Sequence, residues 1–333
     1  MQAVTKTRFP IVFGAMTIGK PGVEQTRIHN LSDAAAVLDI FQKHGHNEVD
    51  TARVYGQGSS EEYLGQLDWQ ARNIVMETKY YPSSSYGQGG THNPEDLRKH
   101  LLASLRALKT DKIDMWYLHG PDRTTPYEAT FRAIDELHKE GYFNRLGISN
   151  YMAWEVAYIN EICIRNGWLR PTVYQGVYNA IHRSVELELF PCLRHYGMAF
   201  YAYNPLAGGY LTSRYHRGEQ KVEEGSRFDP KTRQGTLYKA RYWKEPMFDA
   251  LDIIREAAGK HGLTEVECAL RWMMHHSKLS KEAGDEVIIG ASSKEQLEEN
   301  LVDLEKGPLP EDVVQALDKA WEKTKGVAWN YFH

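Results

Sequence analysis

Four titratable side chains stand where apolar runs of the chain stop. Asp50 and Tyr55 lie in NEVDTARVYG at 47–56, Lys79 ends NIVMETK, and His119 ends IDMWYLH. An ammonium group near a phenol favours the phenolate, so Lys79 would lower the pKa of Tyr55 from about 10 toward neutrality. Asp50 would hold the lysine and His119 would orient a carbonyl oxygen, which leaves Tyr55 as a general acid. This combination suits carbonyl reduction or alcohol oxidation.

Each of these residues has an ordinary structural explanation when it is taken alone. An aspartate after a strand is a common turn residue, and a tyrosine is a common half-buried aromatic. Four such coincidences at successive strand ends are much harder to explain separately. The set contains no Ser-His or Cys-His pair and no carboxylate pair of the glycosidase type. A hydride source would therefore have to be bound as a cofactor.

The four side chains can meet only if the fold brings the ends of several strands together. Most of the apolar runs are continuous, which is typical of parallel strands buried on both faces. Repeated alternation of strand and helix in a single domain, 1–333, predicts an α/β fold of the (β/α)8 TIM barrel type. A doubly wound open sheet is the alternative, which the lack of a GxGxxG motif after the first run disfavours. The eight predicted strands are 10–16, 47–50, 73–79, 113–119, 145–150, 172–179, 199–204 and 286–292.

Helix signals fall between the predicted strands. Ser32 is placed to cap a helix that ends at Gly45, Asn93 precedes a second helix, and Pro126 opens a third that ends at Gly141. The interval between the seventh and eighth strands spans roughly 80 residues, against roughly 25–40 for a usual barrel unit. Such an insertion is expected to form a long loop that covers a ligand at the C-terminal face of the strands.

The composition favours a soluble, cytoplasmic protein. The 3 cysteines, Cys163, Cys192 and Cys268, lie far apart, which indicates reduced thiols rather than a disulfide framework. The formal net charge is -4 without a long Lys/Arg run, so neither nucleic acid nor an anionic membrane is an expected partner. No apolar stretch approaches the roughly 20 residues that span a bilayer. His275 and His276 have no third ligand at usable spacing, so no metal is expected.

Several motifs occur in an order that resembles a known superfamily. DTARVYG, METK, WYLHGPD, GISNY, YQGVYN, AYNPLAGG and IIGASSKEQLEEN together resemble the aldo-keto reductases. YNPLAGG, RYWKE, RWMMHHS and NYFH resemble, more narrowly, the aflatoxin-aldehyde reductase family, which is also associated with succinic semialdehyde reduction. The resemblance runs from about residue 10 to the end of the sequence. It implies NADPH-dependent reduction of aldehydes, with Asp50, Tyr55, Lys79 and His119 as the catalytic tetrad and Tyr55 as the proton donor.

The resemblance also implies where NADPH would bind. Ser149, Asn150 and Gln175 fall on residues that hydrogen-bond the nicotinamide carboxamide, and Tyr203 falls on the aromatic that stacks on its ring. The first two could instead cap the following helix. The loop over the pyrophosphate would comprise Asn204, Pro205, Leu206, Gly208, Gly209, Leu211 and Arg214. The stretch that holds the adenosine 2′-phosphate and adenine would include Ser292, Ser293, Gln296, Glu299 and Asn300.

The chain departs from the wider superfamily in this last stretch. Gly290 and Gln296 stand where many members have a lysine and an arginine. In the aflatoxin-aldehyde type an arginine of the long loop compensates, and Arg227 in GSRF matches it. Because a guanidinium can grip a phosphate with two parallel hydrogen bonds, Arg227 would favour NADPH over NADH.

Substrate contacts are expected from Met16, Tyr238 and Arg241, in addition to His119. The guanidinium of Arg241 would favour aldehydes that carry a carboxylate. Arg53 replaces the apolar residue usual between the tetrad aspartate and tyrosine, and it would add positive charge only if it points into the pocket.

An alternative function is a redox-sensing NADPH-binding subunit similar to the potassium-channel β subunits, which share the tetrad. RYWKE and the closing WNYFH favour the enzyme. Because the family often forms dimers, the resemblance also raises the expectation of a homodimer.

Overall fold

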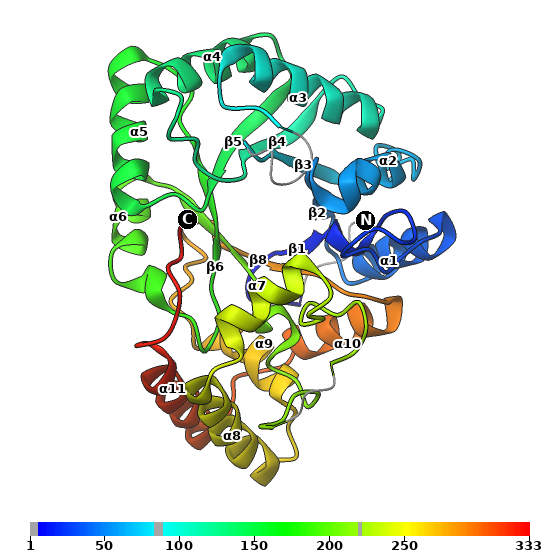
Figure 1. Ribbon diagram of the computed structural model, residues 1–333, viewed down its shortest axis with the longest axis vertical. Coiled ribbons are helices and arrows are strands. Elements are labelled where there is room, and N and C mark those ends of the chain that lie inside the picture. Colours follow the sequence, from blue (N-terminus) through cyan, green and yellow to red (C-terminus); the bar gives the residue numbers. More distant parts are fainter. Residues whose placement is uncertain (1–5, 83–88, 219–221) are drawn as a thin grey trace.

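Eight parallel strands close into a barrel in sequence order (Figure 1), in a computed structural model that describes residues 6–82, 89–218 and 222–333. β1 pairs with β8 in parallel, which closes the barrel. The predicted (β/α)8 TIM barrel is therefore confirmed. Every predicted run overlaps its strand. The strands are β1 (Ile11–Gly14), β2 (Glu48–Asp50), β3 (Val75–Tyr80), β4 (Ile113–Leu118), β5 (Phe143–Ser149), β6 (Val173–Val177), β7 (Ala199–Tyr203) and β8 (Glu286–Ile289).

Helices follow the strands and surround the barrel (Figure 1). The helices before β8 are α1 (Leu31–Lys43), α2 (Ser59–Leu64), α3 (Pro94–Leu108), α4 (Tyr127–Lys139), α5 (Ala153–Asn166), α6 (Leu189–Tyr196), α7 (Arg233–Tyr242), α8 (Glu245–Lys260) and α9 (Glu265–His275). After β8 come α10 (Lys294–Leu304) and α11 (Glu311–Thr324), and α11 packs against α8. Among the described residues, no helix is both long enough and apolar enough to cross a bilayer.

The starts of two helices follow the sequence signals, and the start of the first helix does not. Asn93 caps α3 and Pro126 precedes α4, as expected. The prediction that Ser32 caps the first helix was wrong. Asn30 accepts a hydrogen bond from the backbone amide of Asp33 at 2.7 Å, which begins α1 earlier and leaves Ser32 inside it.

The alternation of side chains along the strands places further charged groups in the barrel interior. Residues two apart on a strand share a face, so Glu48 lies on the same face as Asp50, and Glu77 on the same face as Lys79. Nearer the N-terminal ends of the strands, Arg145 contacts Glu48 at 2.8 Å and Glu77 at 3.8 Å. The barrel interior therefore carries an ion cluster below the lysine, away from the C-terminal opening.

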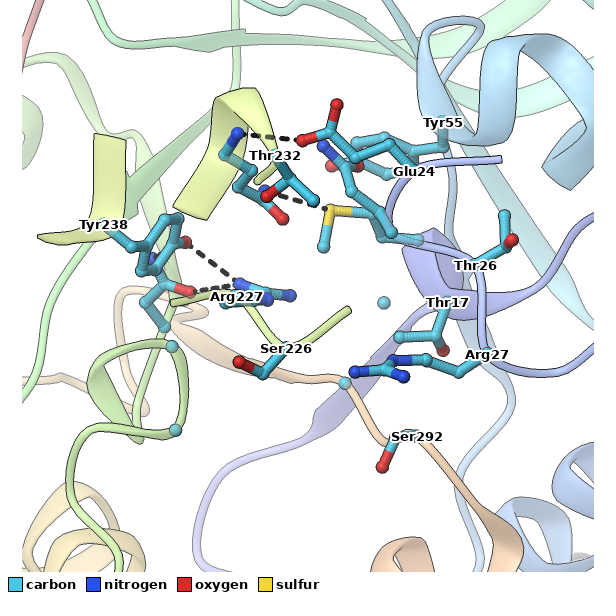
Figure 2. A pocket seen from close by; sticks show the side chains of 18 of the residues that line it. Thr17, Glu24, Thr26, Arg27, Tyr55, Ser226, Arg227, Thr232, Tyr238 and Ser292 are labelled. Carbon is cyan, nitrogen blue, oxygen red and sulfur yellow. Dashed lines mark hydrogen bonds between the residues drawn. The ribbon is translucent and has the colours of Figure 1, made fainter. Parts of the chain in front are cut away.

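The long interval between β7 and β8 contains α7, α8 and α9, and it reaches back to the segment between β1 and α1. The backbone amide of Gln234 donates to the Glu24 carboxylate at 2.8 Å, and this bond is visible at the top of Figure 2. The interval thus bridges across the pocket at the C-terminal ends of the strands, as expected for a covering segment.

Candidate active site

The four strand-end residues lie together at the C-terminal opening of the barrel. Lys79 donates from Nζ to Asp50 Oδ1 at 2.5 Å and to the Thr51 carbonyl at 2.7 Å. The same Nζ lies 4.9 Å from the centroid of the Tyr55 ring. The rings of Tyr55 and His119 meet edge to face with centroids 5.8 Å apart. Tyr55 itself begins the short helix η2 (Tyr55–Gly58), just after β2.

The lysine and the aspartate form a buried ion pair. Burial lowers the pKa of Lys79, and the neighbouring Asp50 carboxylate opposes that shift. Burial likewise raises the pKa of Asp50, and Lys79 opposes it together with Gln175, which donates to Asp50 Oδ1 at 3.0 Å. Each partner therefore sustains the charge of the other. The consequence is a fixed positive charge beside the Tyr55 phenol.

His119 is a neutral imidazole at this site. Burial lowers its pKa well below the usual value, and the charge of Lys79 adds to the shift. The Asn150 amide donates to the His119 carbonyl at 2.8 Å, which fixes the backbone that carries the ring. A neutral imidazole can donate one hydrogen bond to a carbonyl oxygen without adding a second positive charge.

A cavity of about 740 Å³ extends from the tetrad to the start of α10 (Figure 2). It is lined by residues from the β1–α1 segment, the strand ends and the long interval. Most residues predicted to bind cofactor or substrate line this one cavity: Asp50, Tyr55, His119, Met16, Asn150, Gln175, Tyr203, Asn204, Pro205, Leu206, Gly208, Gly209, Arg214, Arg227, Tyr238, Arg241, Ser292, Gln296 and Asn300.

Comparison with known proteins assigns the family. The pattern of the Aldo/keto reductase family matches residues 10–322. The chain is an aldo-keto reductase. It is 49% identical to the aldo-keto reductase pigE of Monascus ruber, with 98% of each chain aligned. It is 44% identical to human aldo-keto reductase family 7 member A3, over 99% of this chain and 98% of that protein. It is also 42% identical to human aflatoxin B1 aldehyde reductase member 4, over 99% of this chain and 98% of that protein.

This aldo-keto reductase is therefore an oxidoreductase that acts on carbonyl groups, and its family typically uses a nicotinamide cofactor. The cavity fits such a group. Asn150, Gln175 and Tyr203 offer amide and aromatic groups beside the tetrad, whereas Arg214 and Ser292 lie on the lining with cationic and hydroxyl groups. Amides, an aromatic ring and anion-binding groups along one cavity are the complement of a dinucleotide. A bound nicotinamide cofactor would supply a hydride at this site, and the residues on the cavity wall would hold and orient it.

Asn150 links neighbouring residues of the reductase's cavity wall, close to the tetrad, by hydrogen bonds. Its backbone φ is +66°, a left-handed conformation in which asparagine is tolerated. Its side chain donates to Ser149 Oγ at 2.9 Å and accepts from the Tyr203 hydroxyl at 3.0 Å. The alternative role of Ser149 and Asn150 as a helix cap was wrong, because α5 begins only at Ala153 and its N-cap residue is Met152.

The two loop glycines of the reductase have different environments. Gly208 has a φ of +70°, and a Cβ there would lie 2.1 Å from the Tyr238 ring, so glycine is required by packing as well as by conformation. At Gly209, with a φ of +93°, nothing lies within 4 Å of a Cβ position. Tyr238 also accepts a hydrogen bond from Arg227 at 3.0 Å, and Arg227 donates to Asn204 Oδ1 at 2.9 Å (Figure 2).

The serine residues before α10 have different roles. Ser293 caps the helix by accepting from the Gln296 amide. Ser292 donates from both its backbone amide and its hydroxyl to Gln296 Oε1, at 2.7 and 2.8 Å. Ser292 lines the cavity and Ser293 does not. A phosphate at Ser292 would therefore replace the Gln296 side chain as the acceptor.

Six predicted site residues do not line the cavity. Lys79 and Ser149 are buried beside it and contact lining residues directly. Leu211 is fully buried in the core and Glu299 is exposed on α10, so direct cofactor contacts are not supported for either. The remaining two are Ser293, described above, and Arg53.

Arg53 does not face the substrate pocket. Its guanidinium donates to the Glu61 carboxylate at 2.5 Å, and Glu61 also accepts from Thr78 Oγ1 at 2.6 Å. Glu61 is fully buried, and the Arg53 side chain is 18% exposed. The structure therefore does not support the prediction that Arg53 contacts substrate. Its pairing with Glu61 holds the turn that carries Tyr55.

Arg53→Met is expected to destabilise the reductase by about 3 kcal/mol, because it leaves the buried Glu61 carboxylate without its cation. The relative kcat/KM for carboxylated and neutral aldehydes should stay within about twofold of wild type, since a charge outside the pocket exerts little differential effect. Urea unfolding measures the first quantity and initial rates measure the second. A stable variant with altered aldehyde selectivity would show that Arg53 contacts the substrate.

Several cavity residues of the reductase escaped the sequence interpretation. Tyr81 lines the cavity, hydrogen-bonds to His333 Nε2 at 2.8 Å and packs edge to face on His119. It follows Lys79 by two positions, so the strand period was a usable signal. His333, and Arg27 in the segment after β1, also line the cavity. The NYFH motif supported the resemblance without placing His333 at the cavity, and none of the motifs contains Arg27.

Proposed function

We propose that this aldo-keto reductase reduces aldehydes at the expense of NADPH, with Tyr55 as the proton donor. Carboxylated aldehydes such as succinic semialdehyde are the preferred class, with dialdehydes and some ketones as further candidates. The observation that carries the proposal is the convergence of Asp50, Lys79, Tyr55 and His119 at one end of a cavity lined elsewhere by arginine and serine. The relatives named as aflatoxin B1 aldehyde reductases support the reaction class.

In this proposal the four tetrad side chains divide the chemistry. His119 donates a hydrogen bond to the substrate carbonyl oxygen and orients it. As negative charge develops on that oxygen, the Tyr55 hydroxyl transfers its proton. The Lys79 ammonium stabilises the phenolate left behind, and Asp50 keeps the ammonium in place. Because Lys79 and Asp50 are buried, little solvent screens this stabilisation.

The nicotinamide end of NADPH is assigned to Asn150, Gln175 and Tyr203, which lie on the cavity wall next to the tetrad. The pyrophosphate is assigned to the loop with Gly208 and Gly209. NADPH rather than NADH is proposed because the same cavity is lined by several arginines and by Ser292.

Arg241 is proposed to select carboxylated aldehydes. Its guanidinium carbon lies 4.9 Å from the Trp329 ring centroid and 5.7 Å from that of Tyr238. Within the described parts of the chain no carboxylate pairs with it. A guanidinium that is held by aromatic rings and lacks an acidic partner is ready to bind a substrate carboxylate.

Arg241→Met is expected to lower kcat/KM for succinic semialdehyde about 30-fold, the effect of losing one charge-assisted hydrogen bond. For 4-nitrobenzaldehyde, which has no carboxylate, the change should be within about threefold. Lys239→Met is a matched control, because it removes a cation from the same helix but outside the cavity. Equal losses for both aldehydes would show that Arg241 supports the site without selecting the substrate.

NADPH oxidation with succinic semialdehyde and with 4-nitrobenzaldehyde tests the proposed function directly. Turnover of either aldehyde supports the reductase. Tight NADPH binding without turnover of any aldehyde would favour the redox-sensing alternative. A cytoplasmic location, a homodimer and a single domain over residues 1–333 stay predictions beside this proposal.

A further inference from the structure

Arg27 lines the cavity but belongs neither to the tetrad nor to the glycine loop. It lies between β1 and α1, and its side chain is 29% exposed. Figure 2 shows its guanidinium directed into the pocket, on the same side as Ser226 and Ser292 and away from Tyr55. Arg27 therefore belongs to the part of the cavity remote from the proton donor.

Arg27 and Arg214 converge on one carboxylate. Arg214 donates to Glu223 Oε2 at 3.0 Å, and Arg27 NH2 lies 4.0 Å from Glu223 Oε1. All three residues line the cavity. A separation of 4.0 Å is too long for a hydrogen bond, so the Glu223 carboxylate is hydrogen-bonded to Arg214 but not to Arg27. A carboxylate of the protein itself thus lies near two guanidiniums on the cavity wall.

The long interval passes close to Arg27 at this point. Arg27 NH2 donates to the Glu224 carbonyl at 3.4 Å. Gly225 has a φ of +69°, and a Cβ there would lie 3.1 Å from Arg27 NH1. Glycine lets the backbone pass within reach of the guanidinium without displacing it. Arg27 still has N–H groups to offer, since its fork carries five and only this one hydrogen bond is formed in the described residues.

Arg227, which the family resemblance favoured for the 2′-phosphate, has a different position. It donates to Asn204, the residue directly after β7, and to Tyr238, which packs on Gly208. These contacts hold Arg227 beside the glycine loop. Arg27, by contrast, reaches into the pocket from the side of Thr17 and Ser292 (Figure 2).

We propose that Arg27 and Arg214 form the subsite for the 2′-phosphate of NADPH, and that the Glu223 carboxylate occupies it in the free protein. This inference rests on the proposed function, which names NADPH as the cofactor. A phosphate monoester offers three charged oxygens where Glu223 offers two, so it can bind both guanidiniums at once. Arg27 thereby favours NADPH over NADH, and Glu223 competes with the phosphate.

Equilibrium binding tests the subsite without any turnover. Titrations of tryptophan fluorescence or calorimetry would give Kd for NADPH, NADH, 2′,5′-ADP and ADP. Arg27→Met is expected to weaken NADPH and 2′,5′-ADP about 30-fold, and NADH and ADP by no more than about threefold. Glu223→Gln should tighten NADPH and 2′,5′-ADP about threefold, because a competing surface charge is removed. Arg217→Met is the matched control, since Arg217 pairs with Asp249 and lies outside the cavity.

Equal weakening of NADPH and NADH by Arg27→Met would overturn the inference, because Arg27 would then serve the pyrophosphate or the loop. The inference would also be overturned if Arg27→Met kept the preference for NADPH over NADH and Arg227→Met lost it. If Arg27→Met does not fold, Arg27→Lys, which keeps the charge but loses the fork, should show an intermediate loss confined to the phosphorylated ligands. Failure of the wild type to bind NADPH would refute the proposed function itself, whereas normal NADPH-dependent turnover with unaltered selectivity in the variants refutes only this inference.

Discussion

Tyr55→Phe is expected to lower kcat for aldehyde reduction by about 1000-fold, because it removes the hydroxyl that is proposed to deliver the proton. The ring stays, so its edge-to-face packing with His119 and its contact with the Lys79 ammonium should persist. Kd for NADPH should therefore change by no more than about threefold. Stopped-flow single turnovers give the chemical step, and quenching of tryptophan fluorescence gives the Kd.

Tyr81→Phe is the matched control for this variant. Tyr81 also lines the cavity and also packs against His119, but its hydroxyl is bonded to His333 rather than assigned to the reaction. We expect a loss of less than about tenfold, as for one neutral hydrogen bond. If Tyr81→Phe is inactive and Tyr55→Phe is active, the proton donor has been assigned to the wrong phenol.

Lys79→Met is also expected to lower kcat by about 1000-fold. The physical cause differs, and the variant should lose stability as well. The variant keeps the Tyr55 hydroxyl and loses the charge that stabilises the phenolate. It also leaves the Asp50 carboxylate buried without its cation, which should destabilise the fold by about 3 kcal/mol. Chemical denaturation and initial rates, measured on the same preparation, separate these two effects.

The double variant Asp50→Asn/Lys79→Met provides the control. Removing both charges of a buried pair avoids the cost of an unpaired ion, so we expect most of the lost stability to return. Catalysis should not return, because the phenol still lacks its ammonium neighbour. A stable and active double variant would show that the ion pair holds the barrel together and plays no part in proton delivery.

Much of the tetrad could be predicted because strand ends are local signals. Asp50, Lys79 and His119 each stand where an apolar run stops, and parallel strands in a barrel bring such ends to one opening. Tyr55 followed from its short distance to Asp50 along the chain. The fold followed from the same eight runs, although β5 begins at Phe143, ahead of the predicted 145.

Side-chain direction in loops could not be predicted in the same way. Arg53 turns toward Glu61 because α2 presents a buried carboxylate there, and nothing in TARVYG reveals it. Leu211 and Ser293 have structural roles that depend on packing and on a helix start. Arg27 approaches the cavity only because the long interval and the segment after β1 meet in space. Contacts of this kind join residues far apart in sequence, where no periodicity applies.

A hydride is expected to pass from NADPH to an aldehyde in this cavity. The most direct measurement uses NADPH deuterated at C4 of the nicotinamide, prepared as each stereoisomer, with succinic semialdehyde as the acceptor. Mass spectrometry of the alcohol should show one deuterium transferred from one of the two isomers, and Tyr55→Phe should abolish its formation at matched times. Bound NADPH with no deuterated alcohol from either isomer, across a panel of aldehydes, would contradict the proposed hydride transfer.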